Sequence, residues 1–246
     1  MIGAIERNFD KKSLRALKKA QKRGVKVFYC TARPYYSVKH IGTFKYFKGD
    51  GIICCNGGMA VYKDEIVYQK TFSKDTLNKV CECVLKHNLN LECTESFTSF
   101  YIAPINEHVK DFLKVYYEPK PVVGSYKDKE IISMLLVAPR EYDEILKLEF
   151  PSEISFYRFS DLGVDLFSIP HEKSTGVKTI LEHLNIAKED TLSIGDDYGD
   201  LAMFNETGIK VAMGNAKDKV KESATFVTKE VWNHGVYHAL KHFNIV

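Results

Sequence analysis

The sequence contains no long hydrophobic run. Its longest apolar stretch, Met134–Ala138, has the length of a strand, whereas a membrane-spanning helix needs roughly 18 consecutive apolar residues. Met1 is not followed by the basic segment and apolar core of a secretion signal. We therefore expect a cytoplasmic protein that does not associate with a membrane.

Cysteine patterns that hold metals or build disulfide frameworks are missing as well. The cysteines lack the Cys-x₂-Cys spacing of zinc sites and are too sparse for a disulfide scaffold. Reduced thiols in a cytosolic protein explain them most simply. The six positions are Cys30, Cys54, Cys55, Cys81, Cys83 and Cys93.

The sequence also has little excess charge. Its 35 Lys and Arg residues and 32 Asp and Glu residues give a net charge of +3, which is too small to indicate nucleic-acid binding. Many of the basic residues fall in a helix predicted over residues 10–24, which ends at Gly24. Because no aromatic residues interleave with them, a solvated helix face is favoured over an RNA or membrane surface.

The stretch with the clearest chemistry is Leu192–Asn215. An apolar run ends at Gly195, two carboxylates follow at Asp196 and Asp197, and Asp200 precedes a helix and another strand. In such units ligands sit at the carboxyl ends of parallel strands. Clustered carboxylates repel one another unless a cation lies between them, and a few hard oxygen ligands suit Mg²⁺. The alternative is an Asp-rich turn in which Asp200 caps its helix.

Two more strand ends carry groups suited to phosphate. A strand over residues 25–30 is followed by Thr31, whose hydroxyl can donate, and by Arg33, whose guanidinium can form a fork to oxyanions. A second apolar strand ends in a flexible turn at Asn56 and Gly57. The alternative for Thr31 is a simple cap of the next helix.

The pattern changes between residues 59 and 168, where hairpins and helices mix as in an α+β module inserted into another domain. At 246 residues and 45% hydrophobic content, the chain is long enough for two cores. We predict a core in two parts, residues 1–58 and 169–246, around this module. Lys173 opens the first helix after it, where backbone N–H groups favour an anion; a plain surface lysine is the alternative.

Taken in order, these motifs resemble the haloacid dehalogenase (HAD) superfamily of phosphohydrolases, specifically its Cof-like branch with a large α/β cap. The resemblance covers nearly the whole chain. It comprises T-A-R-P from Thr31, I-C-C-N-G-G before residue 59, P-H-E-K-S-T-G around Lys173, G-D-D-Y-G-D from Gly195, and T-G-I-K-V-A-M-G-N-A after it. It implies an α/β fold, with a Rossmannoid parallel-sheet core and an inserted α+β cap that selects the substrate.

The resemblance also implies roles for the residues of the core. Asp196 would hold Mg²⁺, and Asp200 would complete or orient the metal shell, with Asp197 at a variable family position. Thr31 would bind a phosphoryl oxygen. Lys173 would neutralise charge on the nucleophile and on the transferring phosphoryl group.

At the rim, Arg33, Asn56 and Gly57 would contact the substrate. The implied activity is Mg²⁺-dependent hydrolysis of small phosphorylated metabolites, such as sugar, nucleotide or cofactor phosphates, through an aspartyl-phosphate. We expect a monomer or weak homodimer that binds no nucleic acid.

The resemblance fails at the start of the chain. The family's nucleophile lies in D-x-D-G-T at the end of the first strand, where the first Asp attacks phosphorus and the second is the general acid or base. The sequence contains no such motif, and its only early acids are Glu6 and Asp10. Met1–Phe9 looks like the continuation of that motif. The first strand is therefore expected to be missing, and a start codon assigned too far downstream, or a truncated gene, is the economical explanation.

Two alternatives to a phosphatase follow from these observations. A chain that truly begins at Met1 would be a catalytically inactive relative that binds a phosphorylated ligand or a protein partner. A receiver-type signalling domain also uses acidic residues, a Thr and a Lys. The inserted module and the order of the motifs disfavour it.

Overall fold

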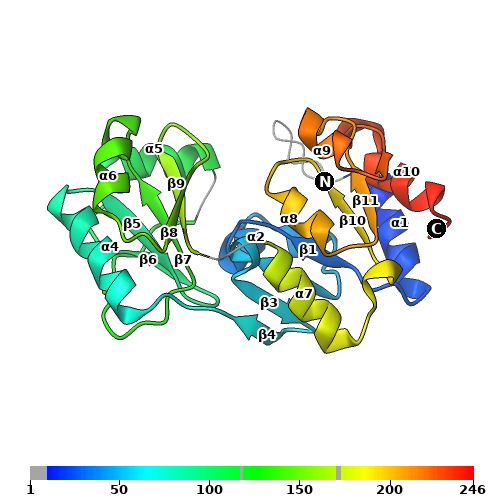
Figure 1. Ribbon diagram of the computed structural model, residues 1–246, viewed down its shortest axis with the longest axis horizontal. Helices are drawn as coiled ribbons and strands as arrows, with labels where there is room; N and C mark the ends of the chain where they lie inside the picture. Colours follow the sequence, from blue (N-terminus) through cyan, green and yellow to red (C-terminus); the bar gives the residue numbers. More distant parts are fainter. Residues whose placement is uncertain (1–9, 117–118, 170–172) are drawn as a thin grey trace. The chain divides into compact units, whose positions relative to one another are not determined.

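The computed structural model describes residues 10–116, 119–169 and 173–246 of the chain. Met1–Phe9, interpreted above as the continuation of a catalytic motif, lie outside the described residues. The chain divides into two compact units, whose elements are labelled in Figure 1. The core unit comprises Met1–Thr31, Thr43–Tyr68 and Glu172–Val246, and the inserted unit comprises Ala32–Gly42 and Gln69–His171.

Two sheets with parallel strands form the centre of the core unit. One has the order β1-β2-β3-β4, in which β1 and β2 are parallel, and the other is the parallel sheet β10-β11-β12. The predicted α/β class with a parallel core is thereby confirmed. The strands are β1 (Phe28–Cys30), β2 (Gly51–Cys54), β3 (Met59–Tyr62), β4 (Glu65–Gln69), β10 (Leu192–Gly195), β11 (Ile209–Ala212) and β12 (Phe226–Val227).

The helices of the core unit lie around these strands, and all of them except α3 contribute residues to one apolar cluster with the strands. The first helix begins where expected, because the carboxylate of Asp10 accepts from the backbone N–H of Lys12 at 2.9 Å, and it buries Leu14, Leu17 and Ala20. The helices are α1 (Lys11–Lys22), α3 (Thr43–Tyr46), α7 (Lys173–Leu184), α8 (Asp200–Asn205), α9 (Asp218–Glu222) and α10 (Gly235–His242).

The two core sheets do not join through any strand of the described residues. β1 is the terminal strand of its sheet, and β10 is the terminal strand of the other. The strand that the family pattern places between these two is the one carrying the nucleophile. Its absence stays a prediction.

The inserted unit is built on a five-stranded antiparallel sheet with the order β6-β5-β7-β9-β8. Its α4 and α6 share a large apolar cluster with the sheet, while Val109 and Phe112 of α5 pack with Tyr101 and Val137 in a second cluster. The elements are α2 (Tyr35–His40), α4 (Lys74–Lys86), β5 (Asn90–Thr94), β6 (Ser99–Tyr101), α5 (Glu107–Tyr116), β7 (Ser133–Val137), α6 (Asp143–Glu149), β8 (Ile154–Arg158) and β9 (Gly163–Ser168).

The structure divides the chain ten residues later than the boundary expected at residue 59. The reason is that β3 pairs antiparallel with β2, from Gly51↔Tyr62 to Cys54↔Met59, so the hairpin extends the core sheet. The short segment Ala32–Gly42, which the sequence placed in the core, belongs to the inserted unit. None of the helices in the described ranges is long and apolar enough to cross a membrane.

Candidate active site

The acidic loop after β10 is organised by Asp200. Its Oδ2 accepts hydrogen bonds from the backbone N–H groups of Asp196 (2.9 Å) and Asp197 (3.2 Å). The side chain folds back so closely that a Cβ added at Gly195 would lie 2.5 Å from the Cβ of Asp200. Only glycine therefore fits at the strand end. Asp200 fixes the shape of the loop as well as supplying charge to it.

A buried ion pair joins this loop to the start of α7. Lys173 Nζ lies 2.6 Å from Asp200 Oδ1, and both side chains are 10% exposed. Burial alone would lower the pKa of Lys173, but the negative charge of Asp200, followed by other nearby groups, holds it above the ordinary value. Lys173 is therefore a fixed cation rather than the plain surface lysine considered above.

The other two carboxylates of the loop differ in their partners. Asp197 forms an ion pair with Lys217 at 2.7 Å and accepts from the backbone N–H of Tyr198 at 2.6 Å. Asp196 is exposed, and Asn215 Nδ2 lies 3.5 Å from its Oδ2. Partial desolvation and then the charge of Asp200 raise the pKa of Asp196. Asp196 is thus the carboxylate whose charge a cation would stabilise most.

The end of β1 lies beside this ion pair. Burial raises the pKa of the Cys30 thiol to about 12, and the charges of Lys173 and Asp200 act on it in opposite directions. The next residue, Thr31, donates its N–H to Ile53 O at 2.9 Å, and its carbonyl accepts from Asn56 N–H at 3.2 Å. The ends of β1 and β2 are therefore joined next to the lysine.

The turn after β2 has an unusual backbone. Cys55, Asn56 and Gly57 have φ values of 52°, 52° and 95°, a conformation that costs free energy in residues other than glycine and clusters at functional sites. Helix α7 packs directly on it, since a Cβ added at Gly176 would lie 2.4 Å from Ile53 Cγ2 and 3.3 Å from Gly57 Cα. This close approach fixes the helix that carries Lys173.

Most of the residues singled out from the sequence thus lie together in the core unit: Thr31, Asn56, Gly57, Lys173, Asp196 and Asp200. The donor set fits Mg²⁺, because one exposed carboxylate, that of Asp196, leaves room for the waters and phosphate oxygens that this ion keeps. Arg33 is the exception, since it belongs to the inserted unit, where its Nη1 donates to Ser37 Oγ at 3.0 Å.

The inserted unit contains a polar row that the sequence reasoning missed. Glu92 and Asp165 pair with Leu135 from either side, so their side chains share one face of the sheet. Glu92 is buried and accepts from the hydroxyls of Tyr36 and Ser99, each at 2.5 Å. The available signal was a single carboxylate in each of the two strands.

Asp165 makes the stability of the inserted unit depend on pH. Burial is the main reason that its pKa rises to about 7; the charge of Glu92 raises it further, and that of Arg33 opposes the rise. Because the ordinary value is about 3.9, the folded chain holds a proton between about pH 4 and pH 7 that the unfolded chain releases. Asp165 therefore lowers stability as the pH rises through this window.

Asp165→Asn is expected to leave the free energy of unfolding nearly unchanged near pH 4 and to raise it by about 4 kcal/mol at pH 8. The neutral amide avoids the cost of ionising the buried carboxyl. Urea unfolding across this pH range measures the effect, with Asp161→Asn, at a 90% exposed side chain, as the control. Parallel pH profiles for wild type and Asp165→Asn would contradict the prediction.

Comparisons with known proteins all indicate the same protein family. The profile of the haloacid dehalogenase-like hydrolases matches residues 6–240. The putative phosphatase YkrA of Bacillus subtilis is 27% identical over 244 residues, 98% of this chain and 93% of the relative.

Solved structures give the same result. A hypothetical protein of Geobacillus kaustophilus HTA426 has a TM-score of 0.91 at 25% identity, covering 98% of this chain and 93% of that one. The HAD subclass IIB sugar phosphatase BT4131 has a TM-score of 0.83 at 25% identity, covering 100% and 95%.

Proposed function

Because the chain belongs to the haloacid dehalogenase-like hydrolases and is a phosphohydrolase, we propose that it hydrolyses small phosphorylated metabolites in a Mg²⁺-dependent reaction. The observation that carries the proposal is the buried Lys173–Asp200 pair between the end of β1 and the exposed carboxylate of Asp196. The fixed ammonium at the start of α7 and the exposed carboxylate after β10, which can bind a cation, would together hold a phosphoryl group.

Each core residue has a distinct task in this proposal. Lys173 balances negative charge on the phosphoryl oxygens, and the hydroxyl of Thr31 donates to one of them. Asp196 holds Mg²⁺, which when bound would supply further positive charge at the same oxygens. Asp200 positions both groups, since one of its oxygens holds Lys173 and the other holds the N–H groups of the acidic loop.

The inserted unit would select the organic part of the substrate. Arg33 can donate hydrogen bonds and the carboxyl groups of the polar row, Glu92 and Asp165, can accept them, which are groups suited to hydroxyl-rich molecules. One similar structure is named a sugar phosphatase, which supports sugar phosphates as the first compounds to test. Exchanging these side chains should re-rank substrates without removing activity on a generic phosphomonoester.

The metal assignment is tested by calorimetric titration with Mg²⁺. Asp196→Asn is expected to weaken binding at least tenfold, because the amide loses the charge of the carboxylate. Asp190→Asn, at an exposed position away from the loop, serves as the control and should bind Mg²⁺ normally. Asp197→Asn should have a smaller effect, because Lys217 already engages that carboxylate. Unchanged Mg²⁺ affinity in Asp196→Asn would show that Asp196 is not a ligand of the metal.

One observation favours a second candidate function. The sequence contains no Asp-x-Asp pair, and the groups gathered in the core unit bind and orient a phosphoryl group without attacking it. A chain of these residues alone would then bind phosphorylated ligands without turning them over. Turnover by the 246-residue chain, compared with turnover by a chain extended with Asp-x-Asp-Gly-Thr, separates the two functions.

A further inference from the structure

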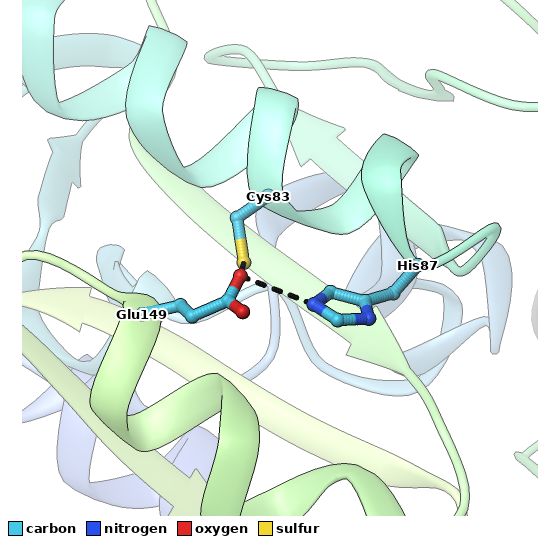
Figure 2. Close-up of side chains that lie close together, drawn as sticks. All are labelled: Cys83, His87 and Glu149. Atoms are coloured by element: carbon cyan, nitrogen blue, oxygen red, sulfur yellow. Dashed lines mark hydrogen bonds and ion pairs between the residues drawn. The ribbon is translucent and has the colours of Figure 1, made fainter.

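Two helix ends of the inserted unit bring a sulfur, a nitrogen and an oxygen together. Cys83 lies in the last turn of α4 and His87 directly follows that helix, four residues later and therefore on the same side. Glu149 is the last residue of α6. Figure 2 shows the three side chains pointing toward one another.

The distances suit a shared ion. Glu149 Oε2 lies 3.3 Å from Cys83 Sγ and 3.1 Å from His87 Nε2, and all three ligand atoms lie within 4.8 Å of one another. A tetrahedral zinc ion with bonds of about 2.0–2.3 Å needs ligand atoms roughly 3.2–3.7 Å apart. Small rotations of the side chains would therefore suffice to enclose an ion. Within residues 10–116, 119–169 and 173–246, no other His, Cys, Asp and Glu side chains form such a group.

The surroundings favour a cation at this point. The carbonyl ends of α4 and α6 meet here, and the negative end of each helix dipole attracts positive charge. Cys83 is 8% exposed, and the side chains of His87 and Glu149 are 16% and 28% exposed, so the ligand atoms are shielded but reachable. Cys83 and Glu149 border a surface hollow of about 480 Å³, which leaves room for a water ligand.

A further side chain already positions the carboxylate. Lys86 Nζ lies 2.9 Å from Glu149 Oε1, which leaves Oε2 directed at Cys83 and His87. Partners of this kind orient metal ligands and tune their affinity. The charges of a thiolate, a carboxylate and a divalent ion sum to zero. The occupied site would therefore not repel the exposed ammonium of Lys86.

We propose that Cys83, His87 and Glu149 form a binding site for a thiophilic divalent transition-metal ion, of which Zn²⁺ is the type, with water as the fourth ligand. On binding, the thiol proton of Cys83 passes to solvent as the sulfur–metal bond forms, and no electrons are transferred. The ion would tie the end of α4 to the end of α6. This site is separate in chemistry from the acidic loop, because Mg²⁺ prefers oxygen ligands and binds thiolates poorly.

Co²⁺ is the probe for the experiment, because a cobalt–thiolate bond gives a charge-transfer absorption band that oxygen ligands do not. The full chain is titrated with Co²⁺ in excess Mg²⁺, which occupies the oxygen-rich acidic loop. We expect one Co²⁺ per chain with a thiolate band, displaced by one equivalent of Zn²⁺. Zn²⁺ should also raise the melting temperature of the inserted unit.

Variants assign the ligands. Cys83→Ser should abolish the band, and His87→Gln and Glu149→Gln should each weaken Co²⁺ binding at least tenfold. Glu82→Gln, which alters the same hollow, and His108→Gln, on an exposed face of α5, are matched controls and should bind normally. Circular dichroism checks that each variant is folded.

Two results would overturn the proposal. One is the absence of a thiolate band in the wild-type chain, a result that does not depend on any variant folding. The other is a band that persists in Cys83→Ser, which would place the ion at another cysteine. Neither result bears on the phosphatase proposal, which uses no residue of this cluster.

Discussion

A chain extended by an apolar strand that ends in Asp-x-Asp-Gly-Thr is expected to hydrolyse a generic phosphomonoester at least ~10⁴-fold faster than the 246-residue chain, the order of loss when an enzyme's nucleophile is removed. The first Asp would attack phosphorus and expel the alkoxide, which the second Asp would protonate to the alcohol. Water would then cleave the aspartyl-phosphate to release inorganic phosphate. Lys173, Thr31 and Asp196 orient the phosphoryl group in either chain, but none of them supplies the attacking carboxylate.

The matched control carries the same extension ending in Asn-x-Asn-Gly-Thr. Among the described residues, β1 and β10 are the terminal strands of two sheets. An added strand that pairs with both should therefore raise the melting temperature with either ending. Only the aspartate form should gain turnover, so the chemical effect is separated from the structural one. If the 246-residue chain is as fast as the extended one, the attacking group lies among its own residues. If neither extended form acts, the ligand-binding role stands in place of the phosphatase.

In the extended chain, Lys173→Ala is expected to lower turnover by about 10²–10³ for every phosphomonoester tested. The buried ammonium acts most strongly on the charge that builds up on the transferring phosphoryl group, so the loss should appear in kcat more than in KM. Steady-state kinetics on a generic phosphomonoester and on several sugar phosphates measure it.

Lys178→Ala is the matched control for this variant. Lys178 lies on the same helix, with a 66% exposed side chain that forms a loose pair with Glu182 at 3.9 Å, and its removal should leave turnover unchanged. Lys173→Arg tests whether charge alone suffices at a site fitted to one ammonium beside Asp200. Normal turnover in Lys173→Ala would contradict the prediction, because it would show that another group stabilises the negative charge of the transferring phosphoryl group.

Local patterns of the sequence singled out the core residues, because each motif that contains them spans only a few positions. Gly195, Asp196 and Asp200 stand directly after an apolar strand, and the family order places Thr31 and Lys173 at other element ends. The structure gathers these strand ends in one unit, as expected for a parallel sheet. Local sequence patterns could not show that Asp197 forms an ion pair with Lys217, because that pair depends on how the loop carrying Lys217 is placed in the fold.

The module boundary and the polar face of the inserted unit required the tertiary structure. The sequence of the hairpin after residue 59 does not indicate which sheet the hairpin joins. Its pairing with β2 in the structure assigns it to the core unit. Glu92 and Asp165 are 73 positions apart in the chain, and the pairing of both strands with β7 sets them on one face.

By itself, the sequence determined the fold class, the family and the residue types at the strand ends, because strand and helix periodicity and short motifs depend on neighbours along the chain. The tertiary structure decided which charges are paired, which carboxyl is buried enough to hold a proton, and that Glu149 meets Cys83 and His87 across two helix ends. These properties depend on distances between residues far apart in sequence, which are set by strand register and helix packing.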